Sequence, residues 1–256
     1  MRSIAIKALG NLRDATLATL YPTFCRVCGA PVGSWRDGVA CAACWEGIEG
    51  TNWNENFCAK CGLPLPPLPA PLPLIARRCG RCDDKAFACA RACGPYEGAL
   101  RESVLWLKMH PQLAPRLRRL LIATFSSAGE LHSSESIIPM PLHPGRLAER
   151  TFNQAEIIAS GLAAATGLRL DTASLVRIRK TEMHRAGMGA RERSASLHGA
   201  FRVRAPRLIE NRRVLLVDDV MTTSSTAHET AQTLIDGGAS AVNVLTLARA
   251  VSLVTQ

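Results

Sequence analysis

The sequence lacks any apolar run long enough to cross a bilayer, although 47% of its 256 residues are hydrophobic. Its N-terminal stretch also lacks the uninterrupted apolar core of an export signal, because Lys7, Arg13 and Asp14 break it. The leucines of this stretch have helical spacing, so we expect residues 1–22 to form an amphipathic helix that packs on the body. These absences predict a cytoplasmic protein with no integral membrane segment.

Acidic residues are also scarce. The chain has 21 Asp and Glu against 31 Lys and Arg, which gives a net charge of +10. The excess is concentrated between Arg146 and Arg213, where 14 basic residues accompany 6 acidic ones. Such a surplus attracts the phosphates of a nucleotide or of nucleic acid. Charge alone does not choose between these ligands, and a solvated basic face would have the same composition.

Cysteine, by contrast, is abundant, and without an export signal ten cysteines favour metal binding over disulfides. Eight of them form four CxxC pairs, in which two thiolates converge on one side of a tight turn. Two such pairs supply the four soft ligands of a tetrahedral Zn²⁺. The spacing therefore predicts two closed, structural zinc sites and a double zinc ribbon over residues 23–90. The eight predicted ligands are Cys25, Cys28, Cys41, Cys44, Cys58, Cys61, Cys79 and Cys82.

The order in which the four pairs combine stays open at this point. Sequential pairing joins the first pair with the second and the third with the fourth, whereas a cross-brace joins the first with the third and the second with the fourth. Gly29 and Gly62 directly follow the second cysteine of two pairs, where the chain commonly needs unusual dihedrals. Cys89 and Cys93 lie outside the CxxC pattern, and we expect them to be small buried residues.

From residue 91 onward the cysteine pattern gives way to alternating strands and helices. Apolar runs at 136–142 and 241–249 are typical of strands, and the segment 153–167 has a helical pattern that ends at a glycine. This alternation predicts an α/β domain over residues 91–256, with a mostly parallel sheet and flanking helices.

The stretch VLLVDDVMTTSST, which begins at Val214, places two adjacent aspartates after an apolar strand. We expect Asp218 and Asp219 to lie at the carboxyl end of that strand, where open α/β sheets bind ligands. Residues 220–226 would form a loop, and a helix would begin near Thr226 or Ala227, so that backbone N–H groups cradle an anion. Carboxylates beside such a cradle suit a ligand with a phosphate and neighbouring hydroxyls, because they accept hydrogen bonds from a diol and help to hold Mg²⁺.

This segment resembles the phosphoribosyl pyrophosphate (PRPP) binding loop of type I phosphoribosyltransferases. The order of motifs along the chain is more specific. The CxxC pairs are followed by YEG (96–98), LK (107–108), PMPLHPGRLAERTFNQ (139–154), GAF (199–201), VLLVDDVMTT (214–223) and LAR (247–249). The chain is thus similar to the ComF family over nearly its whole length beyond the first twenty or so residues. The resemblance implies a type I phosphoribosyltransferase-like fold after a double zinc ribbon, and a link to DNA uptake in competence or to DNA utilisation.

The same resemblance assigns roles to residues. Asp218 and Asp219 would hold the ribose hydroxyls of PRPP, the segment Thr222–Thr226 would hold its 5-phosphate, and Lys108 would lie near the pyrophosphate, with Mg²⁺ bridging ligand oxygens. The implied PRPP-binding set is Asp218, Asp219, Val220, Met221, Thr222, Thr223, Ser224, Ser225, Thr226 and Lys108. The residues implied over the acceptor site are Arg146, Arg150, Asn153 and Gln154. No residue is assigned as catalytic.

Three positions depart from the family pattern. Ser224 replaces the usual glycine of the loop, Thr151 replaces the glycine before FNQ, and His184 stands where a glutamine is usual. If the loop position needs a positive φ, the Cβ of Ser224 costs about 1–2 kcal/mol. That Cβ can also obstruct close approach of a phosphate.

Two functions fit these features. The first is an enzyme that transfers phosphoribosyl from PRPP to an unknown acceptor, which requires an oriented diol and a neutralised leaving group but no covalent nucleophile. The second is a non-catalytic PRPP- or nucleotide-sensing adaptor, which engages single-stranded DNA or competence proteins through its ribbons and basic segment. For base stacking, the candidates in the cysteine-rich half are Trp35, Trp45 and Trp53.

Overall fold

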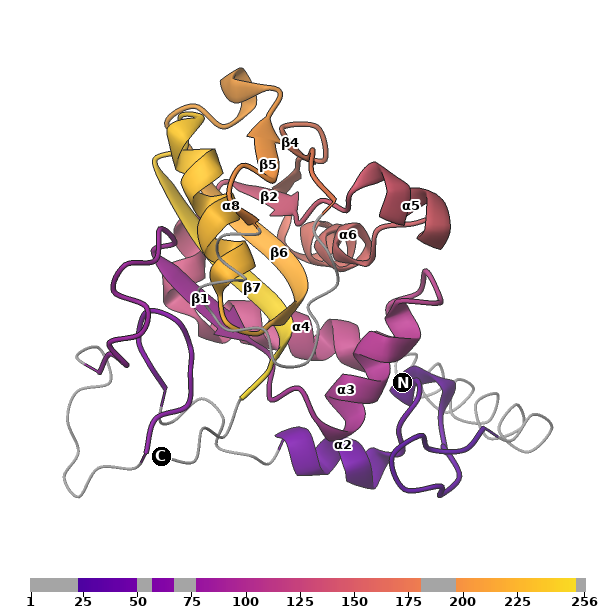
Figure 1. The fold of residues 1–256 in the computed structure, drawn as a ribbon. Helices are drawn as coiled ribbons and strands as arrows, with labels where there is room; N and C mark the ends of the chain where they lie inside the picture. Colours follow the sequence, from indigo (N-terminus) through magenta and orange to yellow (C-terminus); the bar gives the residue numbers. More distant parts are fainter. Residues whose placement is uncertain (1–22, 50–56, 67–76, 181–196, 252–256) are drawn as a thin grey trace, which may run out of the picture.

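The computed structural model describes residues 23–49, 57–66, 77–180 and 197–251. A five-stranded parallel sheet with the order β1-β7-β6-β2-β3 lies at its centre (Figure 1). These strands are β1 (Cys89–Ala92), β2 (Ser136–Pro139), β3 (Arg169–Leu170), β6 (Arg213–Met221) and β7 (Ala241–Arg249). A separate antiparallel pair consists of β4 (Leu175–Arg177) and β5 (Phe201–Val203). The predicted α/β class with a mostly parallel sheet is confirmed.

Helices cover both faces of the sheet (Figure 1). On one face pack α3 (Gly98–Leu107), α4 (Pro115–Ser127) and α6 (Gln154–Thr166), and on the other packs α8 (Ser225–Asp236). The central strands β6 and β7 are mostly apolar, as is typical of strands that are buried on both faces. The shorter elements are η1 (Trp35–Asp37), α2 (Ala42–Glu49), η3 (Gly129–Ser133), α5 (Pro144–Arg150) and η4 (Pro206–Leu208).

Strand β6 is longer than the sequence indicates. The expected strand ended at Val217 and the expected loop ran from residue 220 to 226, but β6 continues to Met221 and α8 begins at Ser225. Pairing with β7 explains the extension, since Val220 pairs with Ala248 and Met221 with Arg249. The predicted loop boundaries were therefore wrong, and the turn between strand and helix has only three residues, 222–224.

Two further predictions from the sequence are confirmed, and three others concern residues that the structure does not describe. Cys89 and Cys93 are both buried, as predicted. Gly29 and Gly62 have φ of 77° and 66°, which confirms the unusual dihedrals expected after the second cysteines. The predicted N-terminal helix, Trp53 and His184 lie outside the described residues.

The two CxxC quartets pack on opposite sides of the sheet. Cys25 and Cys41 belong to the same buried cluster as the side chains of α3, α4 and α6, whereas Cys58 and Cys61 belong to the cluster that contains α8. In the first module the indole N–H of Trp45 donates to the carbonyl of Asp37 at 2.8 Å. The cysteine-rich segments are thus built into the two cores of the α/β domain.

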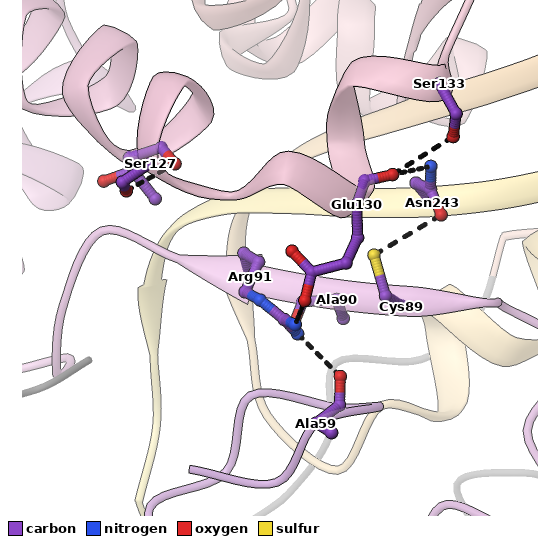
Figure 2. Close-up of polar contacts among 9 residues, drawn as sticks. Ala59, Cys89, Ala90, Arg91, Ser127, Glu130, Ser133 and Asn243 are labelled. Carbon is purple, nitrogen blue, oxygen red and sulfur yellow. Dashed lines mark hydrogen bonds and ion pairs between the residues drawn. The ribbon is translucent and has the colours of Figure 1, made fainter. Parts of the chain in front are cut away.

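A polar network fastens the second cysteine module to the sheet (Figure 2). The guanidinium of Arg91, on β1, forms an ion pair with Glu130 and donates to the carbonyl of Ala59 at 3.0 Å. The side-chain amide of Asn243, on β7, donates to the carbonyl of Glu130 at 3.1 Å. Arg91 is only 6% exposed, so its partners satisfy a buried charge and hold the Cys58–Cys61 turn against β1.

Within the described ranges, every helix is too short or too polar to cross a bilayer.

The fit of the second module on β1 predicts unequal effects of alanine at two glycines. A Cβ at Gly62 would lie 2.8 Å from the carbonyl oxygen of Ala90, whereas a Cβ at Gly29 would meet no atom within 4 Å. Both positions have positive φ, so each Gly→Ala change costs about 1–2 kcal/mol of unfolding free energy. Gly62→Ala adds an overpacking cost of about 1–3 kcal/mol. Denaturant unfolding of the zinc-loaded variants measures both, and equal losses would contradict the close contact.

Candidate functional site

The eight CxxC sulfurs form two compact groups. In the first, the Sγ atoms of Cys25 and Cys44 lie 3.7 Å apart and those of Cys28 and Cys41 lie 3.6 Å apart. All four Sγ atoms of each group lie within 4.8 Å of one another. The groups are Cys25, Cys28, Cys41 and Cys44, and Cys58, Cys61, Cys79 and Cys82. Sequential pairing is therefore the arrangement in this protein.

The sulfur geometry fits a tetrahedral metal ion. Zn–S bonds of about 2.3 Å place the sulfurs of a regular tetrahedron about 3.8 Å apart. In the second group the Cys58–Cys82 and Cys61–Cys79 separations are 3.5 and 3.6 Å. All eight cysteines are free of disulfides. The two groups fit two structural zinc sites, each closed by four thiolates.

A metal ion binds charged thiolates, whereas burial favours the neutral thiol. It raises the pKa of the Cys61 thiol to about 11, and it raises the pKa of Cys82 further above the ordinary thiol value. Without a cation, these buried thiols are protonated at neutral pH. Zinc would replace those protons, and its binding energy would then contribute to folding.

A second candidate site lies at the carboxyl end of β6. Asp218 is half-buried and Asp219 is 8% exposed. Each carboxylate accepts a hydrogen bond at 2.8 Å from the backbone N–H that follows it, of Asp219 and Val220 respectively. Burial and the neighbouring Asp219 carboxylate hold the pKa of Asp218 well above its usual range. The Asp218 carboxyl therefore resists ionisation next to Asp219.

Cationic and amide groups converge on Asp219. The Nζ atom of Lys108 lies 3.7 Å from one carboxylate oxygen of Asp219, and the side-chain amide of Gln154 donates to the same oxygen at 3.3 Å. Arg150 in turn donates to the side-chain oxygen of Gln154 at 3.0 Å. Lys108 ends α3 and Gln154 begins α6, so two helices of one face bring their polar ends to the acid pair.

These side chains line an open cavity of about 290 Å³. Five basic residues share its wall with the two aspartates, so the cavity carries a surplus of positive charge. The residues that line it are Lys108, Met140, Pro141, Leu142, His143, Arg146, Arg150, Gln154, Arg177, Lys180, Asp218, Asp219 and Thr226. An anionic ligand of nucleotide size suits both the volume and the charge.

The short loop after β6 leads directly into the N-terminus of α8. Thr222 and Thr223 are exposed, whereas Ser224 and Ser225 are buried. Ser224 occupies the N-cap position of α8 with φ of 66°, yet its side chain makes no capping hydrogen bond. The first N–H groups of a 12-residue helix therefore lack the side-chain cap that would satisfy them.

The structure brings most of the predicted site residues together. Asp218, Asp219, Thr226, Lys108, Arg146, Arg150 and Gln154 line one cavity, and Val220, Met221, Thr222 and Ser224 line a small recess of about 30 Å³ beside it. Asn153 has a different role, because its side-chain oxygen accepts from the N–H of Ala155 at the start of α6 and its amide donates to Met140.

Sequence reasoning missed three residues of this region. Arg177 is the last residue of β4 and pairs with Phe201 of β5, and Lys180 follows three residues later. Arg249 is the last residue of β7, and its guanidinium lies 3.4 Å from the hydroxyl of Ser224. Its place within the LAR motif was the only sequence signal for that contact.

Comparisons with known proteins agree with these features. A family model described as "Double zinc ribbon domain" matches residues 16–83. DNA utilization protein YhgH of Escherichia coli K12 is 31% identical over 235 residues, which cover 89% of this chain and 97% of that protein. Competence protein F of Haemophilus influenzae is 30% identical over 221 residues, which cover 82% and 90% respectively. The chain therefore belongs to the ComF family, of which these proteins are members.

Solved phosphoribosyltransferases are similar to this chain at lower identity. Glutamine PRPP amidotransferase of B. subtilis, solved with ADP and GMP, is 17% identical with a TM-score of 0.37, and the match covers 56% of this chain and 30% of that one. Adenine phosphoribosyltransferase of Leishmania tarentolae is 14% identical with a TM-score of 0.33, over 59% and 74% of the two chains.

Zinc content tests the two thiolate sites. We expect two zinc ions per chain in the intact protein, one in Cys58→Ser, and two in Cys89→Ser, whose buried cysteine lies outside both groups. Because burial raises the pKa of Cys61, zinc must displace protons, and zinc affinity should fall as pH falls from 8 to 6. Elemental analysis and competition with a chelator measure both. Loss of zinc from Cys89→Ser, or an affinity independent of pH, would contradict the assignment.

The raised pKa of Asp218 predicts that this acid destabilises the ligand-free fold. A carboxyl whose folded pKa is raised binds its proton more tightly when folded, so stability falls as pH rises above the ordinary aspartate range. Asp218→Asn should therefore raise the unfolding free energy at neutral pH, with a smaller gain near pH 4. Exposed Asp236→Asn should change stability by less than about 0.5 kcal/mol. A loss of stability in Asp218→Asn at neutral pH would contradict the claim that the charged Asp218 carboxylate destabilises the fold.

Proposed function

We propose that this protein binds PRPP with Mg²⁺ in the cavity at the carboxyl end of β6. Asp218 and Asp219 hold the two ribose hydroxyls, and the loop 222–224 with the first turn of α8 holds the 5-phosphate. The observation that carries the proposal is the juxtaposition of an acid pair with a helix N-terminus whose N-cap residue does not cap it. One ligand with a diol and a phosphate satisfies both features.

The cations of the cavity fit the other end of such a ligand. Lys108 is 29% exposed at its side chain and lies beside Asp219, where it can reach the oxygens of a pyrophosphate. Arg146, Arg150 and Arg177 lie around the same space. Mg²⁺ would be held by ligand oxygens and by these carboxylates, and it would neutralise the charge of the pyrophosphate. The protein residues orient the diol and the phosphate.

A transfer reaction is the use of PRPP that this geometry favours. Departure of pyrophosphate leaves positive charge at the sugar's anomeric carbon, and an oriented diol with cations around the leaving group supports that step without a protein nucleophile. The names of the relatives, DNA utilization protein and competence protein, support a role for the proposed reaction or recognition in the handling of DNA. The protein would act there as a phosphoribosyltransferase on an acceptor yet to be identified.

A second candidate function rests on a different surface. A largely apolar cavity of about 820 Å³ lies between the first cysteine module and α3–α4, and Phe24, Trp35 and Trp106 contribute to its wall. The guanidinium of Arg26 lies 4.7 Å from the Trp106 ring centroid. Phe24 and Trp35 are exposed, and exposed rings with basic side chains nearby suit stacked bases of single-stranded DNA. This surface favours an adaptor that binds nucleic acid, alone or together with PRPP.

Ligand binding separates these proposals. Isothermal titration should detect PRPP binding that requires Mg²⁺, and the double change Asp218→Asn with Asp219→Asn should weaken it more than about a hundredfold, because two charge-assisted hydrogen-bond sets are lost. Exposed Asp236→Asn is the matched control and should bind as the parent does. Release of pyrophosphate on addition of bases, nucleosides or amines would identify the transferase.

Two outcomes would count against PRPP binding at the acid pair. PRPP affinity that is unchanged by the double substitution would remove the acid pair from the site. Salt-dependent binding of single-stranded DNA that survives the same change, in a protein that does not bind PRPP, would support the adaptor instead.

A further inference from the structure

Arg249 is a buried cation between the two sites described above. It ends β7, where it pairs with Met221 of β6, and it is 4% exposed. One terminal nitrogen lies 3.8 Å from the Sγ atom of Cys61 and 3.4 Å from the hydroxyl oxygen of Ser224. Its other two guanidinium nitrogens are buried and have no hydrogen-bond partner among the described residues.

Such a group requires an anion nearby, because burying an unpaired charge is costly. A zinc ion held by four thiolates carries a net charge of about −2. With zinc bound, the second cysteine group would therefore be the anion that compensates the buried charge of Arg249. The turn that carries Cys61 is also fixed to β1, since the N–H of Ala90 donates to the carbonyl of Lys60 at 2.7 Å.

The other contact of Arg249 is with the hydroxyl of Ser224. Ser224 has the left-handed conformation, with φ of 66°, in which its Cβ is strained, so the positive φ considered from the sequence is present. A serine at an N-cap commonly turns its hydroxyl oxygen onto the helix N–H groups. Here the hydroxyl faces Arg249, and no side-chain cap is made.

We propose that Arg249 is a positioning residue that links the second zinc site to the phosphate loop. Supported by the Cys61 thiolate, it holds the Ser224 hydroxyl away from the N-terminus of α8 and leaves those N–H groups for the 5-phosphate. Metal at the second site and anion binding at the loop then strengthen each other. The first zinc site packs on the opposite face, with α3 and α4, and does not take part.

This inference rests on the proposed function in one respect, that the loop's ligand is the PRPP phosphate. The linkage itself concerns residues 61, 224 and 249 and is open to test without PRPP. Linkage is also reciprocal, so an effect of zinc on ligand affinity must appear as an equal effect of ligand on zinc affinity.

The first experiment is a double-mutant cycle on the full-length, zinc-loaded protein, with the PRPP–Mg²⁺ dissociation constant as the readout. Arg249→Met should weaken binding about fivefold, which corresponds to one ordinary hydrogen bond. In a Ser224→Gly background it should cause no loss, because no hydroxyl remains to be held. Arg249→Lys keeps the charge and should retain part of the affinity. An equal loss from Arg249→Met in both backgrounds would overturn the proposal.

The second experiment measures transfer of zinc to a chelating dye. PRPP should slow the release from the second site and leave the first unchanged, with Cys28→Ser and Cys79→Ser as the variants that each retain one intact site. The effect of PRPP should disappear in Arg249→Met. Equal protection of both sites, or of neither while PRPP binds, would contradict the linkage.

If PRPP binds none of these proteins, the proposed function fails and the linkage is tested alone. In ligand-free protein, the thermal midpoints of Ser224→Gly, Arg249→Met and the double variant should be non-additive, because the two residues are in contact. Additive midpoints would show that the contact has no energetic role.

Discussion

Two carboxylates in adjacent positions at the end of a buried strand are the constraint on which the proposed binding site depends. Asp218 and Asp219 repel each other, and burial raises the pKa of Asp218 further. Lys108, Gln154 and two backbone N–H groups compensate part of this charge. The ligand proposed above, which donates hydrogen bonds and brings a cation, would relieve the remaining repulsion, so the ligand-free fold would be less stable than the complex.

The two cysteine modules pack on opposite faces of the sheet that carries the acid pair. Small ribbons have too little apolar surface to fold alone, and four thiolates around a metal make up the difference. In this chain the ribbons also extend the two cores of the sheet. Arg91 ties the second module to β1 (Figure 2). Arg249 contacts both Cys61 of that module and Ser224 of the loop after β6. The metal sites thereby support the strands and the loop that form the cavity.

Local patterns predicted much of this molecule. The CxxC spacing identified all eight cysteines of the two quartets, and the apolar strand before Asp218 located the acids at the sheet edge. Features that depend on tertiary contact were left open, as the pairing of the quartets was, or missed. The pairing of quartets is set by packing on opposite faces, the extension of β6 to Met221 is set by β7, and the burial of Arg249 is set by a cysteine 188 positions away.

The most direct test of the central claim is a structure of the full-length protein with PRPP and Mg²⁺. We expect the ribose hydroxyls to lie within hydrogen-bond distance of the Asp218 and Asp219 carboxylates, and the 5-phosphate to accept hydrogen bonds from N–H groups at the start of α8. A ligand bound elsewhere, or a phosphate far from residues 222–226 with both carboxylates still paired to the protein, would contradict it.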